Sequence, residues 1–277
     1  MSTMAVEQAQ VVDVESLANQ VSDWLKARLE ESGARTFVLG LSGGIDSAVV
    51  CGLAARGVGA DRVVGVIMPS ASNPDDAVQA AKVASAFDVK TLTVDLTSMA
   101  QSFHASMPTE TALDALRILS SEERDVDARR QLATANVRPR LRMTTLYYVA
   151  NLVKGVVLGT GNKSEAMIGY FTKYGDGGVD LFPIIDLYKF EVRSVAAHIG
   201  VPQSVIDRPP SAGLWQGQTD EDEIGLSYAQ LDEALMAIER GQTAGIAPDV
   251  LDRVKTMNAV SHHKRQPVPT FSKNAAG

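Results

Sequence analysis

The chain has 277 residues, of which 45% are hydrophobic and 21% charged, and its formal net charge is −7 at pH 7. This composition excludes a disordered chain and a membrane-spanning bundle, and the negative charge argues against general binding to nucleic acid or to an anionic membrane. The single cysteine, Cys51, excludes a disulfide framework and a cysteine-based zinc cluster, so we expect a cytoplasmic protein whose partners are small molecules.

The first hundred residues alternate between helical and extended patterns. Apolar residues from Val14 to Leu29 recur at helical spacing and predict an amphipathic helix over residues 13–31. Short apolar runs predict strands at 36–41, 62–69 and 90–96, with helices between them at 46–56 and 75–87. The β-α-β-α-β order predicts an α/β fold, a doubly wound parallel sheet flanked by helices on both faces.

The second part of the chain is richer in helices. A helical region with breaks is predicted at 98–119, and a long helix at 125–153 contains Pro139, which should kink or restart it. A fourth strand is predicted at 154–160, and a glycine-rich loop should end in a short strand at 182–185. The remaining predictions are a helix at 189–199, a polar loop at 208–223, helices at 228–239 and 248–262, and a basic tail.

The turn after the first strand combines glycines with hydroxyl side chains. Its glycines allow a sharp turn and a close approach of phosphate to the backbone, and its serines add hydroxyl donors next to a helix N-terminus. The turn is not a Walker A loop, because no Lys-Ser or Lys-Thr pair closes it, and it lacks the GxGxxG spacing. We therefore predict a phosphate-binding turn made of Gly40, Leu41, Ser42, Gly43, Gly44, Ile45, Asp46 and Ser47.

Asp46 is unexpected in a turn that binds phosphate. One interpretation is a helix N-cap, and Glu165, in the turn after the fourth strand, has its own simple interpretation as a first-turn acid favoured by the helix dipole. The alternative is that the two carboxylates, from two strand ends, hold one Mg²⁺ that bridges phosphate oxygens. We favour the magnesium site, because a shared cation removes the repulsion between carboxylate and phosphate.

Motifs along most of the chain point to a family. SGGIDS resembles the pyrophosphate-binding signature of the N-type ATP pyrophosphatases, and further segments are together similar to the NAD synthetases. These segments occur in the family's order and are NVRPRLRM, GTGNKSE, YFTKYGDGG, PIIDLYK, RPPSAGLWQGQTDEDEIGLSY and SHHKRQPVP.

The resemblance implies an adenine-nucleotide α-hydrolase-like fold and a ligase that forms a C–N bond. ATP and Mg²⁺ would serve to adenylate the nicotinate carboxylate of nicotinic acid adenine dinucleotide (deamido-NAD), and ammonia would displace AMP to give NAD. It also implies a homodimer. The segments outside the matched region leave no room for a glutaminase domain, and Cys51 is no candidate nucleophile, so we expect one domain over residues 1–277 and ammonia as the direct nitrogen donor. The run GNKS, residues 161–164, departs from the ammonia-using bacterial members and resembles archaeal and glutamine-using members, which leaves the nitrogen source open.

The same resemblance assigns residues to roles. Gly40 to Ser47 would hold the ATP phosphates, and Asp46 and Glu165 the metal. Further ATP contacts would come from Thr160, Lys189 and Ser211, where Ser211 stands at a position that is threonine in many members. The positions matching dinucleotide contacts are Arg140, Lys173, Asp180, His263 and Lys264. Asp176 matches an aspartate that binds or deprotonates ammonia, and it and Lys189 are the predicted catalytic residues.

Simpler explanations exist for several of these residues. Lysines are usually solvated, and a basic tail such as the one carrying His263 and Lys264 is usually a frayed terminus. For the whole protein, the alternatives are another ATP pyrophosphatase, such as a tRNA-thiolating or GMP-forming enzyme, and a sensor that binds Mg·ATP without chemistry.

Overall fold

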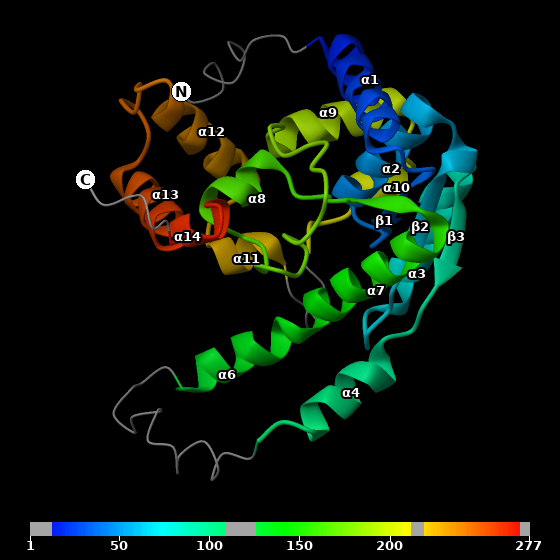
Figure 1. The fold of residues 1–277 in the computed structure, drawn as a ribbon. Coiled ribbons are helices and arrows are strands. Elements are labelled where there is room, and N and C mark those ends of the chain that lie inside the picture. The colour runs from blue at the N-terminus through cyan, green and yellow to red at the C-terminus, as the bar shows by residue number, and fades with distance from the viewer. Residues whose placement is uncertain (1–12, 109–125, 212–218, 272–277) are drawn as a thin grey trace.

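The computed structural model describes residues 13–108, 126–211 and 219–271 (Figure 1). Its centre is a four-stranded parallel sheet in the order β3-β2-β1-β4, so the strand that carries the glycine turn lies between β2 and β4. The predicted doubly wound parallel sheet is confirmed. The strands are β1 (Thr36–Gly40), β2 (Val63–Ile67), β3 (Lys90–Thr93) and β4 (Gly155–Leu158).

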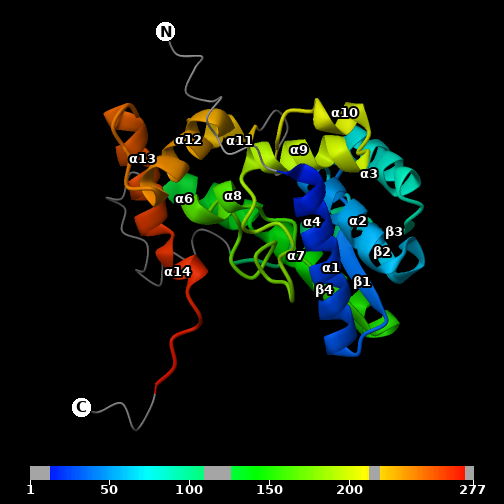
Figure 2. The ribbon, with the colours of Figure 1, turned by 90° about the horizontal axis from the view of Figure 1, so that it is seen from above.

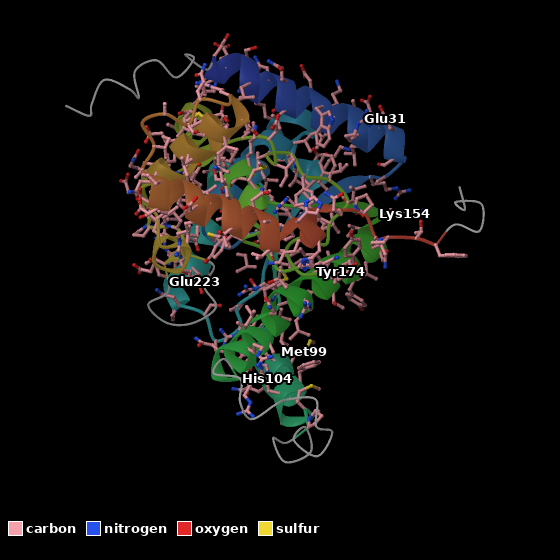
Figure 3. All side chains as sticks on the ribbon, turned by 90° about the vertical axis from the view of Figure 1, so that its left-hand side faces the viewer. Glu31, Met99, His104, Lys154, Tyr174 and Glu223 are labelled. Carbon is pink, nitrogen blue, oxygen red and sulfur yellow. The ribbon has the colours of Figure 1, made fainter. Side chains whose placement is uncertain are left out.

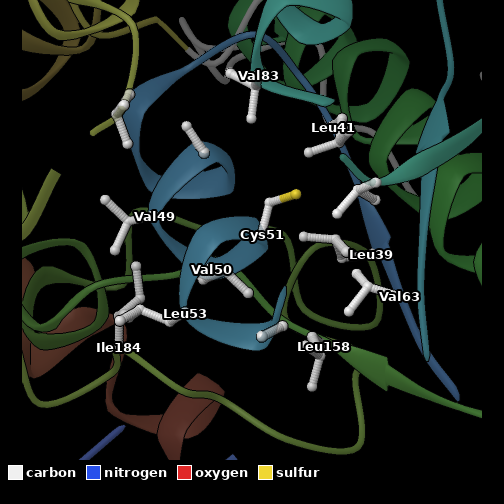
Figure 4. Close-up of a cluster of buried hydrophobic side chains, with 14 of the residues drawn as sticks. Leu39, Leu41, Val49, Val50, Cys51, Leu53, Val63, Val83, Leu158 and Ile184 are labelled. Atoms are coloured by element: carbon white, nitrogen blue, oxygen red, sulfur yellow. The ribbon is translucent and has the colours of Figure 1, made fainter. Parts of the chain in front are cut away.

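One face of the sheet is covered by helices that enclose the largest apolar core. Its fully buried side chains include Leu39 of the sheet and Leu53 of α2, and Cys51 of the same helix points towards Leu39 (Figure 4). Burial raises the pKa of the Cys51 thiol to about 12, so this cysteine packs as a small inert hydrophobe. The helices are α1 (Val14–Ser32), α2 (Ile45–Val58), α3 (Pro74–Ala86), α9 (Lys189–Ile199) and α10 (Gln203–Ile206), with the short η2 (Ala60–Arg62) before β2.

The opposite face packs on α7 (Val137–Val153), with α4 (Thr97–Ala105) beside it (Figure 1). The helical stretch predicted over 125–153 is divided as Pro139 led us to expect: α6 (Val126–Ala135) ends before Asn136 and α7 begins after it. Pro139 lies in the first turn of α7, where its missing N–H breaks no helical hydrogen bond. The proline therefore marks a restart of the helix.

A group of C-terminal helices forms a second apolar cluster beside the sheet layer (Figure 2). Ile224, Leu231, Leu235 and Val254 are its most buried side chains. None of the helices in the described residues is long and apolar enough to cross a membrane. The C-terminal group consists of α8 (Lys163–Ile168), α11 (Asp220–Ile224), α12 (Tyr228–Glu239), α13 (Pro248–Val260) and α14 (His262–Arg265).

Two predictions need correction. No strand forms at 182–185: only an isolated bridge joins Leu181 to Leu158, since Pro183 has no N–H to donate and Ile184 is buried in the core instead. The predicted polar loop at 208–223 is wrong at its end, where α11 begins after Thr219, whose hydroxyl caps the helix by accepting the N–H of Asp222. The predicted helical residues 109–119 lie outside the described part.

Candidate active site

The glycine turn joins the carboxyl end of β1 to the N-terminus of α2. Gly43 has φ +80°, and a Cβ there would collide with the carbonyl oxygen of Asp76 and lie 3.1 Å from Cβ of Gln79, so only glycine fits. The hydroxyls of Ser42 and Ser47 lie 3.1 Å apart and brace the turn internally. Within the described residues no side chain caps the N-terminus of α2, which leaves its first amides available to an anion.

The second strand end lies directly beside the first, because β4 pairs with β1. Asn162 caps α8 in a reciprocal arrangement with Glu165: the Asn162 side chain accepts the N–H of Glu165 at 3.0 Å. Nδ2 of Asn162 also donates to Oδ1 of Asp46 at 2.9 Å. Asp46 lies inside the first turn of α2, whose N-cap is Gly44, so the N-cap interpretation of Asp46 is wrong.

Lys189, the first residue of α9, brings a cation between these carboxylates. Its Nζ lies 2.7 Å from Oδ2 of Asp46 and 3.1 Å from Oε1 of Glu165, and its side chain is 1% exposed. Burial works to lower the pKa of Lys189, but the carboxylates of Asp46 and Glu165 outweigh it and raise the pKa. The pKa of Glu165 is raised chiefly by burial, with the ammonium of Lys189 opposing the rise.

A chain of phenols and carboxylates continues from Glu165 towards the surface. The hydroxyl of Tyr228 contacts both Oε1 of Glu165 and Oδ2 of Asp220, each at 3.1 Å. Tyr170 in turn contacts Asp220, at 3.1 Å, and Glu223. The Tyr228 ring also lies under the Lys189 ammonium, 4.6 Å from its centroid, so the C-terminal helices supply one wall of the site.

The loop at 169–178 contains Lys173 and is contacted by Arg140, His263 and Lys264, which are also predicted to bind the dinucleotide. Arg140 donates to the carbonyl oxygen of Lys173 at 3.4 Å, and Nζ of Lys173 donates to the carbonyl oxygen of His263 at 3.0 Å. Nζ of Lys264 donates to the carbonyl oxygens of Gly169 and Phe171, each at 2.8 Å. The interpretation of this basic segment as a frayed terminus is therefore wrong.

Asp176 lies in the same loop and accepts the N–H of Thr172 at 2.9 Å. Its side chain is exposed, yet the protein around it desolvates the carboxylate enough to raise its pKa, against backbone hydrogen bonds and the positive charges of Lys264 and Arg142. An accessible carboxylate with a raised pKa is suited to accept a proton from a bound ligand.

The other predicted site residues are placed differently. Asp180 accepts the hydroxyl of Tyr147 and the N–H of Val157, both at 2.8 Å, and its side chain is still exposed. It therefore anchors the chain on β4 and keeps a face open to a ligand. Thr160 lies two residues after the end of β4 and is half-buried, and Ser211 lies at the edge of the described residues.

A family model described as NAD synthase matches residues 17–268. This chain belongs to the NAD synthase family. It is 42% identical over 259 residues to an NH₃-dependent NAD⁺ synthetase of Archaeoglobus fulgidus, covering 93% of this chain and 97% of that protein. It is 41% identical over 232 residues to the enzyme of the same name from Methanococcoides burtonii, covering 83% of this chain and 82% of that protein. A solved NMN synthetase from Francisella tularensis superposes with a TM-score of 0.78 at 31% identity, covering 93% and 98% of the two chains.

The NAD synthase site fits a divalent cation. Within the described residues no group of three or more His, Cys, Asp or Glu side chains is arranged around a metal position, but Asp46 and Glu165 already converge on one cation, the Lys189 ammonium. Magnesium usually takes one or two carboxylates and completes its shell with water and substrate phosphates. A pair of carboxylates beside the glycine turn, where α2 begins with uncapped amides, matches that donor set.

Sequence reasoning about this NAD synthase site missed Asn162, Tyr228 and Asp220. Asn162 carried a usable signal, because Asn followed three residues later by Glu is the pattern of a reciprocal helix cap. Tyr228 and Asp220 carried none, since their sequence neighbourhoods look like ordinary helix starts and only the packing of α11 and α12 on α8 brings them to Glu165.

Proposed function

We propose that this protein is an ammonia-dependent NAD synthetase. ATP adenylates the nicotinate carboxylate of deamido-NAD with release of pyrophosphate, and ammonia displaces AMP to form the amide of NAD. The observation that carries the proposal is the buried lysine that bridges two carboxylates at the ends of β1 and β4. The bridge lies beside the glycine turn and the uncapped N-terminus of α2, in a chain of the NAD synthase family.

Each part of the site has a role in adenylation. The glycine turn and the N-terminus of α2 bind the phosphates. Lys189 adds a positive charge, because the neighbouring carboxylates raise its pKa and keep its amine protonated. Asp46 and Glu165 would hold Mg²⁺, which neutralises phosphate charge when bound. The loop carrying Lys173 and the segment carrying His263 and Lys264 face the dinucleotide. Thr160 and Ser211 are proposed as further ATP contacts, and Asp180 and Arg140 as dinucleotide contacts.

Asp176 is proposed to receive the nitrogen donor. Ammonium must lose a proton before its nitrogen can attack the acyl adenylate, and the raised pKa of Asp176 makes its carboxylate a stronger base than an ordinary aspartate. The positive charges of Lys264 and Arg142 act on Asp176 and lower its pKa, which limits the rise that desolvation causes.

The direct test uses the purified protein with ATP, Mg²⁺, deamido-NAD and either ammonium or glutamine. We expect AMP, pyrophosphate and NAD with ammonium, and glutamine turnover equal to ammonium turnover would overturn the choice of donor. Comparable turnover of tRNA or xanthylate would favour one of the other ATP pyrophosphatases. ATP binding with no turnover would favour the sensor. Asp46→Asn and Glu165→Gln should each raise the Mg²⁺ concentration needed for half-maximal AMP formation.

A second acceptor is favoured by one comparison. The Francisella tularensis structure, which superposes over nearly the whole chain, is that of an NMN synthetase. The deamido form of NMN is therefore the competing substrate for this protein. Measuring kcat/KM for both acceptors decides between them, and a higher value for the mononucleotide would replace deamido-NAD in the proposal.

The apolar surface of α4, α6 and α7 supports a homodimer. Five large side chains there are between 41% and 68% exposed, and α4 projects from the end of the molecule opposite α1, where Met99 is seen in Figure 3. Exposed apolar side chains that gather on neighbouring helices are typical of an interface, and α4 lies against α7. Light scattering should give twice the chain mass, and Leu152→Glu should lower it. A cytoplasmic location remains our expectation. The exposed residues are Met99, Phe103, Leu132, Tyr148 and Leu152.

A further inference from the structure

Asp232, on α12, is a buried carboxylate outside the set of residues that face the ligands. Its side chain is 3% exposed, and both of its oxygens have partners on other helices. One oxygen, Oδ1, accepts the hydroxyl of Ser164, and the other, Oδ2, accepts the N–H of Phe190 at 3.1 Å. The oxygen of Ser164 in turn accepts the N–H of Lys189 at 3.0 Å.

These contacts join the starts of two helices. Lys189 and Phe190 are the first two residues of α9, whose amides have no partner inside the helix and need one from elsewhere. Asp232 satisfies one of these N–H groups directly and the other through Ser164, and its negative charge lies at the positive end of the α9 dipole. Within α9 itself, Glu191 accepts only the N–H of Tyr188, at 2.8 Å, so the N–H groups of Lys189 and Phe190 depend on the distant helix α12.

The bridge also fixes distances inside the site. Ser164 precedes Glu165 in α8, and Lys189 follows the loop into α9, so a link from Ser164 to the Lys189 backbone sets where the two side chains start. The Nζ to Oε1 distance of 3.1 Å between Lys189 and Glu165 depends on that spacing. A shift of α9 against α8 would move the ammonium away from the phosphate position.

We infer that Asp232 is a positioning residue of the ATP site, which holds the starts of α8 and α9 together so that the Lys189 ammonium stays between Asp46 and Glu165. This inference rests on the proposed function, since it assigns Asp232 to the binding of Mg·ATP through Lys189. A buried carboxylate with only a structural role would lower stability without changing the affinity of the folded protein for the nucleotide.

Asp232→Asn is the test variant, because asparagine keeps the size but replaces one acceptor oxygen by an NH₂ group that donates. Glu233→Gln, one residue along the same helix and exposed, is the matched control. The probe is α,β-methylene-ATP with Mg²⁺, measured by calorimetry at a temperature where circular dichroism shows every variant folded. We expect Asp232→Asn to raise the Kd roughly 10- to 100-fold, as is typical for groups that orient ligands of a metal site, and Glu233→Gln to leave it within about twofold.

Coupling to Lys189 separates positioning from general damage. In a Lys189→Met background the effect of Asp232→Asn on the Kd should shrink to within about threefold, because the side chain that Asp232 positions is gone. In the wild-type background the KM for deamido-NAD should stay within about twofold while the KM for ATP rises. An equal loss of affinity in both backgrounds, or an unchanged Kd in Asp232→Asn, overturns the inference.

Ser164→Ala breaks the same bridge from the other side and serves if Asp232→Asn does not fold. It should raise the Kd in the same direction and show the same coupling to Lys189, and an unchanged Kd would overturn the inference as well. The wild-type protein keeps the two hypotheses apart: if it binds the probe and makes NAD, the function stands whatever the Asp232 result. Failure of the wild-type protein to bind the probe refutes the function itself.

Discussion

Replacing Lys189 by methionine removes the only positive charge described between Asp46 and Glu165. Lys189→Met keeps a chain of similar length but leaves two carboxylates facing each other, with contacts of 2.7 and 3.1 Å lost. Breaking a buried ion pair by removing one partner costs about 3–5 kcal/mol. The side chain of Asp46 is 19% exposed and that of Glu165 16%, so water still reaches both carboxylates and reduces the cost of leaving them unpaired. We therefore expect the free energy of unfolding to fall by about 3 kcal/mol, near the lower end of that range.

Thermal unfolding of the ligand-free protein in EDTA at pH 7 measures this loss. A change of that size should lower the Tm by roughly 6–12 °C for a chain of this length. The double variant Glu165→Gln with Lys189→Met should be more stable than Lys189→Met alone, because the glutamine ends the repulsion with Asp46. Mg²⁺ without nucleotide should raise the Tm of Lys189→Met more than that of the wild type, since the metal takes the place of the ammonium.

Two outcomes would refute this reasoning. If Lys189→Met melts within about 2 °C of the wild type, the buried ammonium does not hold the two carboxylates together. If Glu165→Gln lowers the Tm further in the Lys189→Met background, Asp46 and Glu165 do not repel each other. The two carboxylates then do not form a site that needs a cation.

The other predictions concern the turn, the nitrogen donor and pH. Gly43→Ala should abolish Mg·ATP binding in calorimetry and lower the Tm, because alanine is strained at φ +80° and its Cβ meets the Asp76 carbonyl; wild-type affinity would contradict it. Asp176→Asn should raise the KM for ammonium and spare the KM for ATP. Burial works to raise the pKa of Glu239, but hydrogen bonds from Tyr188 and Lys163 outweigh it and lower the pKa. Glu239 should therefore stabilise the fold above its ordinary pKa of 4.5 and lose that contribution as the pH falls further. In thermal melts from pH 3 to 7, Glu239→Gln should lose at most about 1 kcal/mol of stability at pH 7 and approach the wild type at the acid end.

Local patterns in the sequence were sufficient for much of the fold. Alternating and helical spacing predicted the four strands and most helices, because side-chain direction along a strand or helix depends on neighbours only a few residues away. The glycine turn and the pairing of Asp46 with Glu165 were also accessible, since strand ends in a parallel sheet share one edge. Pro139 predicted either a kink or a new start, and the structure has the new start, at Val137. The sequence did not decide between the two, because a proline in a helical pattern permits both.

Contacts between side chains that are far apart in the sequence were decided only by the tertiary structure. Lys189 could be predicted to bind a phosphate, but its place between two carboxylates depends on how α9 packs across the sheet and on the cap that Asp232 provides. Tyr228 and Lys264 likewise acquire their roles from contacts with residues more than sixty positions away. The sequence by itself determined the four strands of the sheet and the turn after the first of them. The place of Lys189 between Asp46 and Glu165 is a property of packing, because no local pattern records which distant helix will lie against the two strand ends.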